Sequence, residues 1–343
     1  MLGVKGYDGM DSAGWSNAER IPAKIAGKTF VERTMTMTQK LSRRNFIAQG
    51  SAAGAAVALT ASLPNVLRAD PLGRAPGIQL YTVAASLAED VPGTLKGLSK
   101  IGYKYVETAG FAKLSAKDFR KALDDASLNC PSAHLRFTTA DPGPLFEDAH
   151  AVGAHYAVSS VLIAKPAGDS MGSYLNALST LTIDDFKKTA ELANQIGAKA
   201  KQAGLQYAYH NHNFEFKDQG NGQIGYDLLI KETDPELVKF ELDCGWIVAA
   251  GYNPVDYFEK YPNRYRMMHV KDFLAGAKPT TDLHGESRPK GTELGKGHID
   301  YKPIFAAAGP AGVEYYFSEQ EPPILGMTQL EAAKVNYEYM HAL

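Results

Sequence analysis

Short apolar runs alternate with segments of helical period from about residue 77 onward. Runs rich in β-branched and aromatic residues predict eight strands, at 77–83, 103–108, 129–135, 156–163, 206–212, 238–243, 265–271 and 313–320. Segments whose apolar residues share one helix face predict eight helices, at 92–101, 116–126, 145–152, 183–203, 226–232, 254–260, 302–308 and 328–341. Each predicted strand is therefore followed by a predicted helix.

This regular alternation indicates the fold class. Strands that are joined through helices pair in parallel, and eight strand–helix units within about 270 residues close into a barrel. The sequence predicts a single α/β domain over residues 71–343, with the (β/α)8 TIM-barrel architecture. Two long segments, 165–183 and 272–299, follow the fourth and seventh strands, where barrel loops usually wall the substrate site.

The first 70 residues have a different character. Arg43 and Arg44 form a twin-arginine pattern, and a run of small and apolar residues follows at 50–61. This order is typical of an export signal, and the run is too short and too rich in Gly and Ala to span a membrane stably. We predict that residues 1–70 are an N-terminal extension that carries a signal, and that the twin-arginine export machinery delivers the protein to the periplasm. Cleavage and anchoring of the segment both stay open.

Polar side chains that can bind metal stand at the ends of the last four predicted strands. They are His210 with His212 close by, then Asp243, His269 and Glu319. Because the carboxyl ends of barrel strands meet on one face, we expect four of these side chains to surround one divalent ion. Two imidazoles with two carboxylates suit Mn²⁺, Co²⁺, Zn²⁺ or Fe²⁺ better than Mg²⁺.

Composition narrows the range of partners. A net charge of -2 offers no basic surface for nucleic acid. The two cysteines, Cys130 and Cys244, form no Cys-x-x-Cys pair of the kind that holds zinc. Both fall inside or beside predicted strands, which disfavours a disulfide between them.

Several short motifs, taken in order, resemble one family. The matching pieces are Gly77-Ile78-Gln79-Leu80-Tyr81, Tyr105-Val106-Glu107, Ser132-Ala133-His134, Tyr209-His210-Asn211-His212-Asn213-Phe214-Glu215-Phe216, Glu241-Leu242-Asp243, His269-Val270-Lys271-Asp272, Glu293-Leu294-Gly295 with Gly297 and Ile299-Asp300-Tyr301, and Glu319-Gln320. Together they resemble the sugar phosphate isomerase/epimerase family, the xylose isomerase-like barrels that also include the apurinic endonuclease type 2 fold. The resemblance extends over nearly all of the chain after residue 70.

The resemblance implies a divalent metal that is held by one residue from each of strands five to eight. Many relatives supply Glu, Asp, His and Glu, and the last three match Asp243, His269 and Glu319. No Glu stands at the first position here. His210 fits that position best, and His212 competes with it because alternation along a strand puts both side chains on one face.

A metal that chelates a carbonyl and its neighbouring hydroxyl acidifies the adjacent C–H bond and stabilises an enediolate. Glu319 is expected to act as the base while it ligates the metal, and Lys271 to hold a substrate oxygen or developing oxyanion. The alternative for Lys271 is a salt bridge with Asp272 or Glu241. The other predicted site residues are Glu215, His212 and His134 as acid or proton shuttle, Gln79 and Glu107 as ligands for sugar hydroxyls, and Trp246 as an apolar wall.

These inferences predict a metal-dependent isomerase or epimerase that acts on a free or keto sugar or glycoside through an enediolate. The first alternative is a lyase or hydratase of 3-keto-glycosides on the same metal site, because the absent first Glu weakens an exchange between two carboxylates. The second is a non-catalytic periplasmic sugar-binding barrel. A nuclease is disfavoured by the net charge of -2. The sequence leaves the sugar, the metal and the oligomeric state open, a homo-oligomer included.

Overall fold

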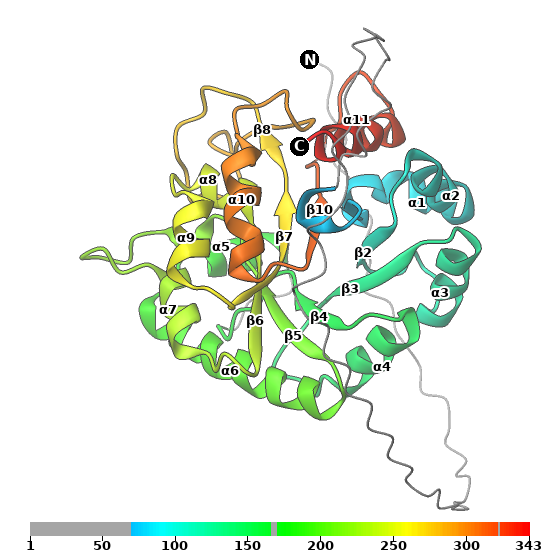
Figure 1. Ribbon diagram of the computed structural model, residues 1–343. Coiled ribbons are helices and arrows are strands. Elements are labelled where there is room, and N and C mark those ends of the chain that lie inside the picture. The colour runs from blue at the N-terminus through cyan, green and yellow to red at the C-terminus, as the bar shows by residue number, and fades with distance from the viewer. Residues whose placement is uncertain (1–69, 166–169, 322) are drawn as a thin grey trace, which may run out of the picture. The chain divides into compact units, whose positions relative to one another are not determined.

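The computed structural model describes residues 70–343 except 166–169 and 322. The predicted signal segment lies outside the described residues, so periplasmic export stays a prediction. Eight parallel strands close into a barrel in the order β1-β10-β7-β6-β5-β4-β3-β2 (Figure 1), which confirms the predicted TIM barrel. The barrel strands are β1 (Gly77–Gln79), β2 (Tyr105–Ala109), β3 (Asn129–Leu135), β4 (Tyr156–Ser159), β5 (Gln206–His210), β6 (Val238–Asp243), β7 (Tyr265–Val270) and β10 (Tyr315–Ser318).

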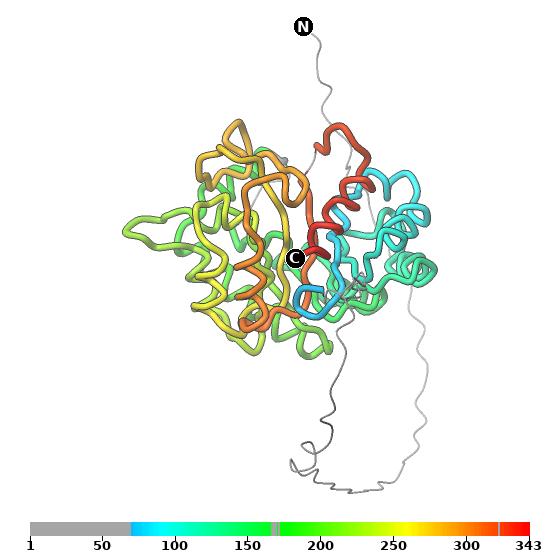
Figure 2. Tube along the Cα trace, turned by 45° about the horizontal axis from the view of Figure 1, so that its top comes forward, coloured from blue at the N-terminus to red at the C-terminus, as the bar shows by residue number. Residues whose placement is uncertain are grey.

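Helices surround the ring of strands in both overall views (Figures 1 and 2). They are α1 (Ala84–Glu89), α2 (Val91–Ile101), α3 (Ala116–Asp125), α4 (Gly143–Val152), α5 (Met171–Ser179), α6 (Ile183–Gln202), α7 (Gly225–Glu232), α8 (Cys244–Ala249), α9 (Pro254–Lys260), α10 (Tyr301–Ala311) and α11 (Gln329–His341). The described residues also form the short 3-10 helices η1 (Pro71–Gly73), η2 (Leu80–Val83) and η3 (Phe214–Phe216). Within the described residues, no helix has the length and apolar character needed to cross a membrane.

Three of the described helices, α1, α5 and α8, were not predicted from the sequence. The cause is clearest for α8. Its apolar residues directly follow β6, so from the sequence the segment looks like a continuation of the strand and not like a new helix. The Asp243 side chain accepts a hydrogen bond from the Trp246 backbone N–H at 2.8 Å and caps the new helix. The predicted first strand is also too long, because the Gln79 side chain accepts from the Tyr81 N–H at 3.0 Å and the chain turns into η2.

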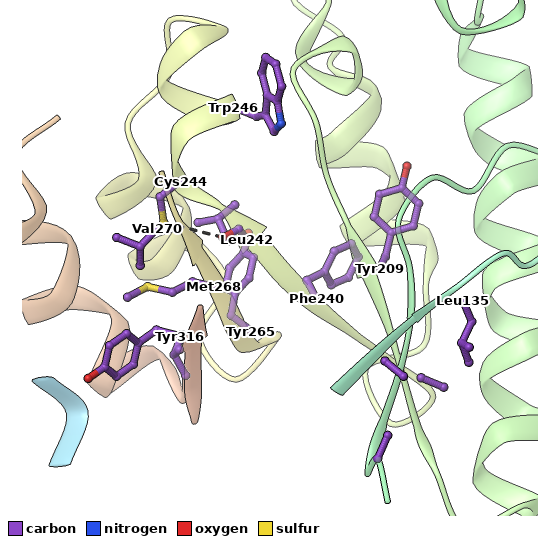
Figure 3. Packing of buried hydrophobic residues seen from close by; sticks show 14 of the residues in the cluster. Leu135, Tyr209, Phe240, Leu242, Cys244, Trp246, Tyr265, Met268, Val270 and Tyr316 are labelled. Carbon is purple, nitrogen blue, oxygen red and sulfur yellow. Dashed lines mark hydrogen bonds between the residues drawn. The ribbon is translucent and has the colours of Figure 1, made fainter. Parts of the chain in front are cut away.

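Alternation along each strand divides the side chains between two environments. On β6, Phe240 and Leu242 belong to the main apolar core, where Figure 3 shows Leu242 near Met268 and Val270 of β7. A separate apolar cluster, contributed by Tyr156, Val158, Ala208, Met267 and Phe317, fills positions that alternate with the core. The intervening residues at the carboxyl ends of the strands are polar, which reserves that end of the barrel interior for chemistry.

Both cysteines are buried and free, so Cys130 and Cys244 form no disulfide in the described structure. The Cys244 thiol instead donates to the Leu242 carbonyl at 3.8 Å, which Figure 3 marks with a dashed line.

The segment between β7 and α10 contains a small antiparallel pair, β8 (Asp272–Phe273) and β9 (Gly291–Thr292). The Asp272 carboxylate accepts hydrogen bonds from four backbone N–H groups of residues 295–299, at 3.0 to 3.2 Å. A side chain at Gly297 would collide with this carboxylate. The Gly-x-Gly part of the motif therefore fastens the long loop back onto the end of β7.

Helix α11 closes the barrel beside the first strand–helix unit. It lies next to α2 in both overall views (Figures 1 and 2), and its Leu330 side chain packs on Gly97. The buried Asn336 amide donates to the Gln320 side chain at 3.1 Å, and its carbonyl accepts from the Leu294 N–H at 2.9 Å. Asn336 thus connects the long loop to the segment that follows β10.

Candidate functional site

Four predicted ligands lie close together at the carboxyl ends of β5, β6, β7 and β10, and we call them the rim set: His210, Asp243, His269 and Glu319. Asp243 and His269 are register partners on neighbouring strands, and Asp243 Oδ2 lies 3.7 Å from His269 Nδ1. Glu319 Oε2 lies 2.7 Å from the same nitrogen. His210 Nε2 lies 3.9 Å from Asp243 Oδ2. These separations are close to those between neighbouring ligands of a single divalent ion.

Lys271 places its ammonium among three carboxylates at the rim. Its Nζ lies 3.0 Å from Asp243 Oδ2, 3.0 Å from Glu319 Oε2 and 2.8 Å from Glu321 Oε1. Glu321 also pairs with Arg288 of the long loop at 2.8 Å. The structure therefore gives Lys271 partners other than those anticipated from the sequence.

A second set of polar side chains comes from β1, β2, β3 and β6 and contacts the rim histidines, and we call it the floor: Gln79, Glu107, Ser132, His134 and Glu241. Glu107 is fully buried and is held at both oxygens, by the Ser132 hydroxyl and by the Gln79 amide at 2.8 Å. The register pairing of Gln79 with Glu107 on adjacent strands brings these two together. The structure thus places Gln79 and Glu107, the predicted ligands for sugar hydroxyls, in buried positions and bonded to each other.

Glu241 joins the floor to the rim. Its Oε2 lies 2.7 Å from His134 Nε2, 3.0 Å from His210 Nδ1 and 3.2 Å from His269 Nε2. The sequence interpretation overlooked Glu241 as a site residue. Its position two residues before Asp243 on β6 puts both carboxylates on the inner face, which is the signal that identifies it.

The donor chemistry of the cluster fits a divalent ion in two ways. Asp243, His269 and Glu319 form one group whose ligand atoms all lie within 4.8 Å, and His134, His210, Glu241 and His269 form another. Glu241 Oε1 is buried and accepts no hydrogen bond from the residues that the structure describes, and buried Asp243 Oδ2 has the Lys271 ammonium beside it at 3.0 Å. Buried oxygens of this kind are what a cation would satisfy.

Electrostatics set the charge of each group. Burial and the nearby positive His269 lower the pKa of His210 well below its ordinary value, so its imidazole is neutral and can ligate. Burial alone would raise the pKa of Glu241, but His269 and His134 hold it at about 2. Burial likewise opposes the ionisation of Glu319, and Lys271 and His269 nevertheless keep its pKa well below the usual range.

His212 and Trp246 form one wall beside the rim set. The His212 ring lies between Phe214 and Trp246, at centroid distances of 6.1 and 5.9 Å. His212 Nδ1 and Trp246 Nε1 are buried without a hydrogen-bond partner in the described part of the chain. Burial and the Lys271 charge lower the pKa of His212 to about 3, so its ring is neutral at pH 7.

Replacing His210 and His212 in turn is expected to separate ligation from proton transfer. His210→Ala should lose bound divalent metal, because His210 Nε2 faces Asp243 at 3.9 Å. His212→Ala should keep the metal and lose activity by roughly 10²- to 10⁴-fold, the usual contribution of a general base. Metal analysis of both purified variants checks this, and metal loss in His212→Ala alone would make His212 the first ligand.

Glu215 is a buried acid whose charge is disfavoured. Burial raises its pKa to about 8, although its oxygens accept from the His212 N–H at 2.9 Å and the Tyr209 hydroxyl at 3.0 Å. A raised carboxyl pKa means that its contribution to stability is complete below the unfolded pKa near 4.5 and disappears as pH rises through 8.

Glu215→Gln, which mimics the protonated acid, is expected to match the wild type at pH 4.5 and to be more stable at pH 9 by a few kcal/mol (~2–4). Denaturant unfolding across this pH range measures the difference. The exposed Glu259→Gln provides the control for the loss of a carboxylate as such. A constant difference for Glu215→Gln would show that the acid ionises normally.

Comparisons with known proteins agree with this architecture. An inosose dehydratase of Lacticaseibacillus casei is 27% identical over 256 residues, which cover 64% of this chain and 79% of the relative. An inosose dehydratase of Clostridium perfringens is 28% identical over 241 residues, covering 65% and 80%. A sugar phosphate isomerase/epimerase structure from Parabacteroides distasonis is 26% identical with a TM-score of 0.61, over 82% of this chain and 97% of that one. The model of the xylose isomerase-like TIM barrel family matches residues 95–323, and this chain belongs to that family.

Proposed function

We propose that this protein is a divalent-metal-dependent lyase that removes water from a polyhydroxylated ketone, either a cyclic polyol ketone or a keto-glycoside. The sequence similarity to inosose dehydratases over most of the barrel is the observation that carries the proposal. Their name assigns them the dehydration of an inosose. The rim set combines a neutral imidazole with ionised carboxylates, and these groups could hold a metal ion that polarises a ketone carbonyl.

The groups around the rim divide the reaction among themselves. A divalent ion held by the rim set would polarise the ketone and acidify the C–H bond next to it. The Lys271 ammonium stabilises the oxyanion that develops as this proton leaves. His212, neutral and with a free Nδ1, takes the proton, and Glu319 is the alternative base. His134, whose pKa the carboxylates of Glu107 and Glu241 raise to about 9 against the effect of burial, protonates the departing hydroxyl.

Epimerisation or isomerisation through the same enediolate is the second candidate. The Parabacteroides distasonis structure supports it, since its name assigns isomerase/epimerase activity at 26% identity. Return of a proton to the opposite face needs two bases that face each other across the substrate. Here Glu319 is one candidate base, whereas the His210 ring is already engaged by Glu241 at 3.0 Å. This asymmetry favours elimination.

The test is incubation of the metal-loaded protein in D₂O with inososes, 3-keto-glycosides and free ketoses. The proposal predicts a product that lacks one water and absorbs in the ultraviolet as an enone or enol. Deuterium bound to carbon in a product that has not lost water would assign the second candidate instead. Absence of both exchange and dehydration with every ketone would contradict the enediolate chemistry and favour a sugar-binding barrel.

A further inference from the structure

Each of the two rim histidines contacts the floor through one ring nitrogen and the rim through the other. His210 directs Nδ1 to Glu241 at 3.0 Å and Nε2 toward Asp243 at 3.9 Å. His269 directs Nε2 to Glu107 at 2.6 Å and to Glu241 at 3.2 Å. Its Nδ1 faces Glu319 at 2.7 Å. The two rings therefore present opposite nitrogens to the same rim.

We propose that Glu241 and Glu107 are positioning residues that fix the ring protons of His210 and His269, so that His210 Nε2 and His269 Nδ1 are the nitrogens that ligate the rim metal. This inference rests on the metal site of the proposed function. A neutral imidazole carries one N–H and one lone pair, and an ionised carboxylate can only accept. Contact with Glu241 therefore places the His210 N–H at the floor and leaves its lone pair at the rim. Both nitrogens of His269 face carboxylates, so without metal this ring carries both protons. An ion at the rim would displace the proton on Nδ1, while Glu107 and Glu241 keep the proton on Nε2.

Crowding at one oxygen supports this assignment. Glu241 Oε2 has three imidazole nitrogens within 3.2 Å, from His134, His210 and His269. One acceptor oxygen satisfies three N–H donors at once, whereas three lone pairs aimed at it would repel it. The anchoring of Glu107 by Gln79 and Ser132 holds the second acceptor still. The floor is thus built as an acceptor surface under the two ligands.

A second group of residues offers a competing metal site. His134, His210, Glu241 and His269 also lie close enough together to bind an ion directly. An ion at the floor would need the lone pairs of His210 Nδ1 and His269 Nε2, which is the opposite tautomer for both rings. The position of one proton on each ring therefore decides between a positioning floor and a ligating floor.

Nitrogen-15 NMR of histidine-labelled protein measures that position directly. In the metal-free wild type, His210 is expected as the Nδ1–H tautomer. After loading with ¹¹³Cd²⁺, cadmium couplings are expected at His210 Nε2 and His269 Nδ1. Couplings at His210 Nδ1 and His269 Nε2 would overturn the inference and make the floor the metal site.

Metal affinity provides a second measurement that needs no substrate. Glu241→Gln is expected to weaken Co²⁺ binding by about 10- to 100-fold, the usual effect of removing such a support, and to alter the Co²⁺ absorption bands. Glu293→Gln is the matched control, since Glu293 is also a buried carboxylate but bonds to Gln320. Its affinity should not change.

The outcomes separate this inference from the proposed function. Tight Co²⁺ binding in the wild type with unchanged affinity and spectrum in Glu241→Gln would overturn the positioning role and leave the lyase proposal intact. A wild type that dehydrates a ketone without binding metal would overturn the metal site and with it this inference. If Glu241→Gln does not fold, the wild-type NMR measurement still decides the question.

Discussion

Asp243→Asn is expected to lose its bound divalent ion and at least about 10³-fold in activity, since a Lewis acid supplies several kcal/mol of transition-state stabilisation. Asp243 has one oxygen for each of two tasks. Oδ1 caps α8 by accepting from the Trp246 N–H, and Oδ2 faces the rim. An asparagine keeps the cap through its carbonyl and turns an amide, a donor, toward the metal and Lys271. The fold should therefore survive while the site is lost.

Metal analysis, activity and thermal unfolding of the same preparation check this prediction. Asp300→Asn is the matched control, because Asp300 caps α10 in the same way and lies outside the site. It should keep both metal and activity. Asp243→Ala should lose about 1 kcal/mol more stability than Asp243→Asn, which is the usual value of a helix cap. Full metal content in Asp243→Asn would remove Asp243 from the ligand set.

Lys271→Met is expected to destabilise the metal-free protein by about 3–5 kcal/mol, the usual result of removing one partner from a buried ionic group. Lys271 is fully buried, and three carboxylate oxygens lie within 3.0 Å of its ammonium. Without it, Asp243 and Glu319 repel each other across the rim. A divalent ion restores a positive charge at the same oxygens, so metal should raise the unfolding temperature more in Lys271→Met than in the wild type.

Thermal unfolding with and without Zn²⁺ measures this difference. The Lys239→Met variant is the control, since Lys239 is also largely buried on β6 but donates to the Asn263 carbonyl. Zn²⁺ should protect it no more than the wild type. Lys271→Met should still lose activity when loaded with metal, because the group that stabilises the oxyanion is gone. Equal stability of the metal-free wild type and Lys271→Met would show that Lys271 does not balance the rim carboxylates.

The barrel could be predicted because its evidence is local. Each strand is a short apolar run, and each helix has apolar residues along one face. Helix α6 also begins with a capping box at Thr182. The same locality explains the errors at strand ends. The fifth strand was predicted to reach His212, whereas the chain leaves the sheet at His210.

The rim residues were predicted to lie together because each stands at the end of its own strand, and the structure brings them together. Gln79, Glu107 and His134 of the floor were also predicted as site residues, but the bonds among the floor residues were not, since these depend on pairings between strands that the local pattern does not contain. Gln79 meets Glu107 only through the register of β1 with β2, and Glu107 meets His269 from across the barrel interior. Side chains that look free to bind a sugar in the sequence are therefore already bonded to one another in the fold.

Glu319 directly follows β10, and α11 supports the segment that contains it. These two elements are the last of the barrel in chain order. During synthesis the seven earlier strands emerge first, and they carry His210, Asp243 and His269 without Glu319 and without Asn336 to fix the neighbouring Gln320. A growing chain therefore exposes an unfinished set of ligands. An ion held by the complete rim set would have to wait until α11 has been synthesised, so it would bind a folded barrel and would not guide the folding of the nascent one.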